Sequence, residues 1–346
     1  MATERGYLNW LAEKTATRWW HDSGDPDELR RGLSRGACGV TTNPILSYQT
    51  LTSNPRAWAD ALSALPAGLS KEEQPEALIR CVVTRAATTL KPVYEQTRGQ
   101  HGYVCAQVNP GRAGDRGAML AMAQRFSALA PNITVKLPVT SAGLDVLEDC
   151  TAEGISCTMT MSFGVAQSIA TAERYRLGAR RAERAGKTPP QCFSVVMMGR
   201  IDDYLRDVAR DWQSDVTEPD IRQAGLAVSK RACRIYRERG YEARLLVAAF
   251  RSPHQVAALA GGEFLMSIHP KIQGMIAGAD LPREPGIDAD IAPDVVERLM
   301  GLPDFVKAFE PDGMEPQDFI TYGLAQRTLS QFVESGWSRL EAMVLP

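Results

Sequence analysis

The sequence lacks long apolar runs and an excess of charge of either sign. Its 346 residues include 39 Lys and Arg against 41 Asp and Glu, so that the formal net charge is −2. A nearly neutral chain has no general attraction to nucleic acid or to an anionic membrane, and we expect neither as a partner. No run approaches the roughly 18 apolar residues of a membrane-spanning helix, and the N-terminal stretch has no apolar signal core. A small phosphorylated substrate remains compatible with this charge, because two local arginines can bind it.

Paired cysteines and clustered histidines are also missing. The seven cysteines are odd in number, widely spaced and without any C-x-x-C pair. This pattern favours a reduced, cytoplasmic setting over a disulfide framework or a structural zinc site. The four histidines, His21, His101, His254 and His269, show no metal-ligand spacing, so we expect no metal site.

What the sequence does contain is a regular alternation of short apolar runs and helical patterns. The runs that we interpret as strands are residues 17–22, 38–43, 102–108, 133–139, 155–161, 192–198, 243–250 and 263–269. Continuous apolar strands separated by helices predict a parallel sheet, and eight of them over this length predict an α/β fold of the (β/α)8 TIM-barrel type. A doubly wound sheet is less favoured, because no G-x-G-x-x-G motif follows the first strand.

Helix signals separate these strands. The clearest predicted helices are residues 140–154, 166–186 and 218–240, each of which ends at a glycine. The stretch "DPDEL" at 25–29 has an aspartate at the N-cap, a proline at the first helical position and a glutamate at the third, which predicts a capping box.

Two segments are too long for a minimal barrel. Residues 45–101 exceed one connecting helix, and residues 271–317 are rich in Pro and Gly turns. We interpret both as insertions into a single barrel domain spanning residues 1–346, where they can cap the active site or form the interface of a homo-oligomer. Residues 318–343 predict an amphipathic C-terminal helix packed on the barrel.

A lysine interrupts the apolar run "ITVKLPVT" at 133–140. Burial would strip Lys136 of hydration, lower its pKa and leave a neutral amine able to attack a carbonyl, which is what a Schiff-base nucleophile requires. The plainer alternative is a lysine that extends from a strand end to water. This strand alone does not decide between them.

Other polar residues lie in or just after the remaining strands, where barrel enzymes place their active sites. They are Asp22, Thr41, Asn43, Gln107, Thr160, Arg200 and Arg251. Each also has an ordinary structural explanation. Asp22 can end a strand, Asn43 before Pro44 is a common turn pair, and Thr160 can fill a strand. Arg200 can pair with a neighbouring aspartate, Asp202 or Asp203, and Arg251 can be a surface loop charge.

Six motifs, in order between about residues 15 and 275, resemble those of the transaldolase family. They are "GVTTNPIL" (39–46), "ITVKLPVTSAGL" (133–144), "EGISCTMTMSF" (153–163), "MGRIDDY" (198–204), "AAFRS" (248–252) and "LMSIHPKI" (265–272). That family is a (β/α)8 barrel with a C-terminal helix, in agreement with the strand count. The resemblance implies a cofactor-independent enzyme that transfers a three-carbon dihydroxyacetone unit between sugar phosphates.

The resemblance also implies a role for each matching residue. Lys136 would form an imine with a ketose, and Asp22 would be the acid/base at the hydroxyl next to the breaking bond. Thr41 and Asn43 would hold substrate hydroxyls, and Thr160 would position the catalytic water. Arg200 and Arg251 would bind the phosphate.

Several positions depart from the family pattern. Gln107 stands where transaldolases have a glutamate, and the related fructose-6-phosphate aldolases also have glutamine there; this favours a simple aldolase, whereas chain length favours group transfer. Thr158 stands where transaldolases commonly have an asparagine beside the imine. Met197, Val195 and Ala249 replace residues of the water and phosphate contacts. A third interpretation is a sugar-phosphate-binding barrel that has lost turnover.

Overall fold

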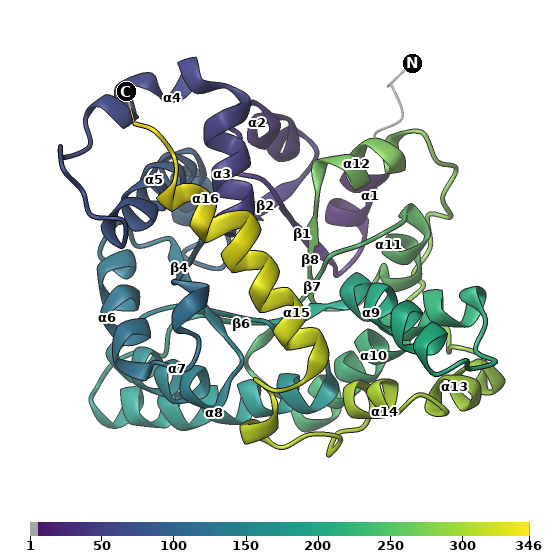
Figure 1. Cartoon of the computed structure of the whole chain (residues 1–346). Helices are drawn as coiled ribbons and strands as arrows, with labels where there is room; N and C mark the ends of the chain where they lie inside the picture. The colour runs from purple at the N-terminus through teal and green to yellow at the C-terminus, as the bar shows by residue number, and fades with distance from the viewer. Residues whose placement is uncertain (1–5, 346) are drawn as a thin grey trace, which may run out of the picture.

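The structure is a computed structural model that describes residues 6–345. Eight parallel strands form a closed barrel in chain order, and β8 pairs with β1 (Figure 1). The strands are β1 Arg18–His21, β2 Ala37–Val40, β3 Tyr103–Gln107, β4 Ile133–Pro138, β5 Cys157–Thr160, β6 Cys192–Met197, β7 Arg244–Ala248 and β8 Leu265–Ile268. The predicted (β/α)8 barrel is confirmed, and the doubly wound alternative is wrong.

Helices separate the strands and surround the barrel. They are α1 Tyr7–Lys14, α2 Pro26–Ser34, α3 Pro44–Ser53, α4 Pro55–Ser63, α5 Glu73–Gln96, α6 Arg116–Ser127, α7 Ser141–Glu153, α8 Val165–Arg184, α9 Met198–Asp211, α10 Glu218–Arg239, α11 Pro253–Leu259, α12 Pro270–Ala277, α13 Pro293–Met300, α14 Pro303–Phe309, α15 Gly323–Phe332 and α16 Ser338–Glu341. Short 3₁₀ turns are η1 Pro110–Arg112 and η2 Pro316–Asp318, and η3 Val333–Trp337 is a π-helical turn. Among the helices of residues 6–345, none is both long and apolar enough to cross a membrane.

Two of the helix ends predicted from a glycine are capped as expected, and one predicted helix start is capped only in part. Helices α7 and α10 end at Gly154 (φ 91°) and Gly240 (φ 56°), in the left-handed conformation that favours glycine. At the start of α2, the Asp25 side chain accepts the backbone N–H groups of Asp27 and Glu28. The Glu28 carboxylate, however, accepts the Ser23 hydroxyl at 2.6 Å, so the predicted capping box is only half formed.

Strand β2 is shorter than predicted. It ends at Val40, whereas the sequence predicts a strand to Asn43. Asn43 instead begins α3, because its side-chain oxygen accepts the backbone N–H of Leu46 at 2.9 Å. The residues after Val40 therefore form a loop at the C-terminal end of the strand, where active-site residues of barrels are carried.

Aromatic rings fill part of the barrel interior. The ring of Phe193, near the start of β6, lies 4.7 Å from that of Trp20 and 5.3 Å from that of Tyr103, the first residue of β3. Gly39 makes room for this packing, since a Cβ there would lie 2.5 Å from the Trp20 ring. Because Tyr103 and Phe193 lie at strand starts, they fill the barrel interior toward its N-terminal end.

The C-terminal segment lies across the barrel. Helix α15, η3 and α16 form one helical element that runs across the front of the barrel in Figure 1, coloured yellow. It packs against α3, α5 and α9. Gly336, in the π-helical turn, allows the close approach to α3, since a Cβ there would lie 2.7 Å from the Ile45 backbone nitrogen. The predicted helix over 318–343 thus exists, beginning at Gly323.

Candidate active site

A cavity of about 370 Å³ lies at the C-terminal ends of the barrel strands. Seven of the nine predicted site residues line it: Asp22, Thr41, Asn43, Lys136, Thr160, Arg200 and Arg251. They come from six different strands or from the loops that follow them. The closed barrel therefore brings into one space residues that are separated by more than two hundred positions in sequence.

A larger cavity, of about 890 Å³, lies elsewhere and contains none of these residues. Several of its charged groups pair with one another: Arg234 pairs with Asp290 and Arg237 with Asp288. The ammonium of Lys230 donates to three backbone carbonyls. Volume alone therefore does not identify the site, and the smaller cavity is the one with groups available for chemistry.

Lys136 lies on β4, in register with Gln107 on β3 and Thr158 on β5. The residue is only 6% exposed, and its Nζ donates to the backbone carbonyl of Thr42 at 3.0 Å. Burial lowers the pKa of the amine, the nearby Asp22 carboxylate opposes this shift, and the Arg200 cation adds to it. The side chain thus ends in the cavity rather than in bulk water, in an environment that favours the neutral amine.

A chain of hydroxyl groups holds Asp22. The Thr41 hydroxyl donates to Asp22 Oδ1 at 2.6 Å and lies 2.5 Å from the Ser267 hydroxyl on β8. Because Thr41 has a single hydroxyl proton and gives it to Asp22, Ser267 must be the donor in the second contact. Ser267 is missing from the sequence prediction, although a serine inside the apolar run "EFLMSIH" is the same kind of signal that selected Thr160.

Thr160 and Asn43 line the cavity, and each already makes a polar contact within the protein. The Thr160 hydroxyl lies 3.7 Å from Met197 Sδ, a weak acceptor. The Asn43 oxygen caps α3, as the turn interpretation predicts, yet the residue also faces the cavity. Asn43 thus caps α3 and lines the cavity at the same time.

Gln107 and Thr158 do not line the cavity. Gln107 is 3% exposed, and its Oε1 is buried without a hydrogen-bond partner among the described residues. The Thr158 hydroxyl contacts the Thr134 hydroxyl at 3.0 Å and the Cys105 thiol at 3.5 Å. Both residues are strand neighbours of Lys136, so they shape its surroundings from the side.

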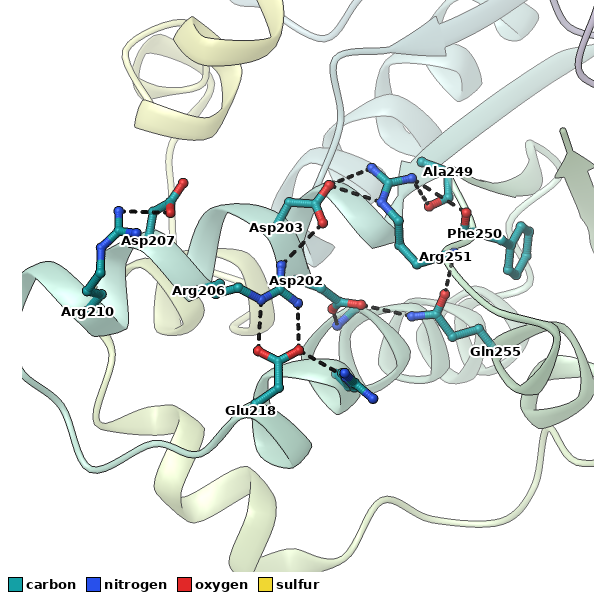
Figure 2. Close-up of polar contacts among 12 residues, drawn as sticks. Asp202, Asp203, Arg206, Asp207, Arg210, Glu218, Ala249, Phe250, Arg251 and Gln255 are labelled. Atoms are coloured by element: carbon teal, nitrogen blue, oxygen red, sulfur yellow. Dashed lines mark hydrogen bonds and ion pairs between the residues drawn. The ribbon is translucent and has the colours of Figure 1, made fainter. Parts of the chain in front are cut away.

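Two arginines stand at the cavity on the β6 and β7 side. Arg200 donates to Gln331 Oε1 at 2.6 Å and lies 5.3 Å from the Phe332 ring, so the C-terminal helix holds it. Burial, together with the Arg251 cation, lowers its pKa to about 10, which leaves it charged at neutral pH. The structural alternative, in which Arg200 pairs with Asp202 or Asp203, is wrong: Asp203 binds Arg251 instead, at 2.7 Å and 3.0 Å (Figure 2).

Further cavity-lining residues escaped the sequence prediction. His269 and Lys271 follow β8, and Phe332 comes from the C-terminal helix. Only the tertiary structure brings Phe332 to the strand ends, so no local pattern could identify it. Across residues 6–345, no group of three or more His, Cys, Asp or Glu side chains could hold a metal ion.

Comparison with known proteins agrees with this fold. The profile of the family described as Transaldolase/Fructose-6-phosphate aldolase matches residues 19–300. The chain is 32% identical over 193 residues to transaldolase 2 of Nostoc sp., which covers 53% of this chain and 51% of that protein. It is 30% identical over 198 residues to the transaldolase of Neisseria gonorrhoeae, with 56% and 54% covered. These matches span about half the length of the relatives. The chain belongs to the transaldolase/fructose-6-phosphate aldolase family.

Proposed function

We propose that this chain makes and breaks a carbon–carbon bond through an imine on Lys136. The neutral amine adds to the C2 carbonyl of a ketose phosphate, and one water leaves. A base removes the C4 hydroxyl proton, the C3–C4 bond breaks, and its electron pair forms a three-carbon enamine on the lysine. The phosphorylated aldehyde departs. The enamine then adds to an acceptor aldehyde, and water releases the new ketose and restores the amine.

One observation carries this proposal: a buried amine with a lowered pKa shares a cavity with a carboxylate and two arginines. In this scheme Asp22 takes the hydroxyl proton, and its hydrogen bond from Thr41 fixes its orientation. The Arg200 and Arg251 guanidinium groups bind the phosphate, for which their planar donors are suited.

The remaining predicted site residues serve supporting roles in this scheme. Asn43 contacts substrate hydroxyls, and Thr160 orients the water that enters and leaves during imine exchange. Gln107 and Thr158 flank Lys136 in the sheet and shape its environment.

Gln107 supports a second candidate, a simple aldolase. Its unpartnered Oε1 can orient a water molecule but cannot accept a proton at neutral pH. In that reaction the enamine takes a proton and water then releases free dihydroxyacetone, without any acceptor sugar. The two functions differ only in what captures the enamine.

The test is borohydride trapping with fructose 6-phosphate and, separately, with dihydroxyacetone, followed by peptide mass spectrometry. We expect a reduced three-carbon adduct on Lys136 that is absent from Lys136→Met. Release of free dihydroxyacetone without an added aldose phosphate would identify the aldolase, whereas dependence on the acceptor would identify the transferase. Phosphate binding without any trappable adduct would rule out both the transferase and the aldolase and would identify a non-catalytic binding barrel.

A further inference from the structure

The loop after β7, which carries Arg251, is anchored through a buried carboxyl on another helix. The backbone N–H of Arg251 donates to Gln255 Oε1 at 2.7 Å, and Gln255 Nε2 donates to Asp202 Oδ2 at 2.8 Å (Figure 2). Asp202 Oδ1 accepts the backbone N–H of Gly225, on α10, at 2.8 Å. Asp202 is 2% exposed and Gln255 is 4% exposed. The contacts thus run from α10 through α9 and α11 to the backbone of the proposed phosphate-binding arginine.

Every hydrogen bond in this relay has a fixed direction. The backbone N–H groups of Arg251 and Gly225 can only donate. Gln255 must therefore turn its oxygen toward Arg251 and its NH₂ group toward Asp202, and Asp202 must accept on both of its oxygens. An ionised carboxylate satisfies this requirement, whereas a protonated one gives up an acceptor site.

Close packing leaves the Arg251 loop little freedom apart from this relay. A Cβ at Gly199, on α9, would lie 2.0 Å from the Ala249 carbonyl oxygen and 2.8 Å from Arg251 Cγ. Ala249 has a left-handed φ of 65°, uncommon for a residue other than glycine. The guanidinium of Arg251 is held by the Asp203 carboxylate and by the Ala249 carbonyl, the latter at 2.8 Å. The loop is thus pressed onto α9, and the relay holds its backbone.

We propose that Asp202 and Gln255 are positioning residues that set the affinity of the cavity for the phosphate end of its substrate by fixing the place of Arg251. Neither residue lines the cavity, so neither touches the substrate. This inference rests on the phosphate role proposed above for Arg251. It does not involve the amine chemistry of Lys136, and the two can be tested separately.

The relay also connects phosphate affinity to pH. Burial raises the pKa of Asp202 to about 7; the hydrogen bonds from Gly225 and Gln255 and the Arg251 cation oppose the shift, and the Asp203 charge adds to it. Elsewhere on α9, the Tyr204 hydroxyl donates to Asp304, and Arg327 pairs with Asp207. Protonation of Asp202 as pH falls through about 7 removes one acceptor, which loosens the Arg251 loop and weakens phosphate binding.

A pair of reciprocal substitutions tests the relay. In Asp202→Asn an amide NH₂ faces another donor, and in Gln255→Glu two carboxylates face each other. The double variant restores every bond with the charge moved: the new amide at position 202 would accept from Gly225 and donate to the new carboxylate at position 255, whose second oxygen accepts from Arg251. We expect each single variant to weaken binding of inorganic phosphate, measured by titration calorimetry, about tenfold. The double variant should recover to within about threefold of the wild-type chain.

Borohydride trapping of dihydroxyacetone, which has no phosphate, is the control and should be unchanged in all three variants. Single variants that bind phosphate as the wild-type chain does, or a double variant weaker than both singles, would overturn the inference. So would Arg251→Gln binding phosphate normally, because Arg251 would then not be the phosphate ligand. If Asp202 governs phosphate affinity but no ketone can be trapped, the positioning role stands and the imine function fails. The phosphate affinity of the wild-type chain, divided by that of Asp202→Asn, should decrease as the pH is lowered from 7. A ratio that does not change with pH would count against the acceptor role of Asp202.

Discussion

The two walls of the cavity differ in kind. On the side of β1, β2 and β8, the groups Asp22, Thr41 and Ser267 form a directed hydrogen-bond chain. On the side of β6 and β7, the wall below the arginines is apolar: Val195, Met197, Leu246, Ala248 and Ala249. Within each of these strands, the pairs 195 with 197 and 246 with 248 follow the two-residue period of inward-facing positions. The polar wall can move and hold protons, whereas the apolar wall can only shape the substrate and exclude water.

The departures from the family pattern are distributed unevenly between these walls. The three departures that line the cavity, Val195, Met197 and Ala249, all lie on the apolar wall, whereas the other two, Gln107 and Thr158, flank Lys136 outside the cavity lining. Asp22, which matches the pattern, belongs to the polar chain. We infer that the imine chemistry and the substrate contacts occupy separable parts of the cavity. Substitutions on the two walls should therefore affect different kinetic properties.

The largest effect should come from removing the amine. Lys136→Met keeps a similar shape in β4 but has no nucleophile, so we expect at least a ~10³-fold loss of ketose cleavage. Stability should not fall, because a thioether costs less to bury than an amine. A coupled assay for the released aldehyde and thermal unfolding measure the two outcomes. Lys91→Met, at an exposed lysine on α5, is the matched control and should leave activity unchanged; residual cleavage by the Lys136 variant would reassign the nucleophile.

The next effect should come from breaking the polar chain. Thr41→Val retains the shape of the side chain but leaves the Asp22 carboxylate without its 2.6 Å donor. Loss of a hydrogen bond to a charged group costs about 1.5–3 kcal/mol, so we expect kcat to drop roughly 10- to 100-fold. Ser267→Ala acts one bond farther from Asp22 and should cost less. Equal losses in the two variants would mean that the chain does not act through Asp22.

A smaller effect should follow from adding a polar group to the apolar wall. Ala249→Ser places a hydroxyl beside the proposed phosphate position and keeps nearly the same volume. A hydrogen bond to a charged group is worth at least about 1.5 kcal/mol, so we expect KM for a ketose phosphate to fall about tenfold. Trapping of dihydroxyacetone should not change. An equal gain for the unphosphorylated ketone would place the new contact away from the phosphate.

The smallest effect should be the electrostatic influence of Arg200 on Lys136 across the cavity. The Arg200 cation contributes to the lowered pKa of Lys136, after the dominant contribution of burial. Arg200→Gln should raise that pKa, so that the neutral amine appears at higher pH. The pH profile of dihydroxyacetone trapping, which avoids the phosphate role of Arg200, should shift upward. A downward shift would show that the arginine does not act on the amine through its charge.

The sequence predicted the barrel well because parallel strands are buried on both faces and read as continuous apolar runs. It also indicated seven of the ten polar residues that line the cavity, because the ends of barrel strands are where active-site side chains are carried. Thr158 shows the limit of this rule. It lies two residues before Thr160 on β5, farther from the strand end, where its hydroxyl contacts Thr134 and Cys105 and does not reach the cavity. Side-chain pairings between segments that are distant in sequence could not be predicted. Nothing local in "GRIDDY" indicates that Arg200 binds Gln331 and leaves Asp203 to Arg251.

The helical element of α15, η3 and α16 has a consequence for how the protein is made. All eight strands, with the lysine and both arginines, precede it in the chain. During synthesis on the ribosome, the barrel can therefore close before Gln331 and Phe332 have emerged. A product cut short by a premature stop near residue 320 would keep Lys136 but lose Phe332, which lines the cavity, and Gln331, which binds Arg200. Such a fragment would lack part of the cavity wall and the contact that holds one of the two arginines.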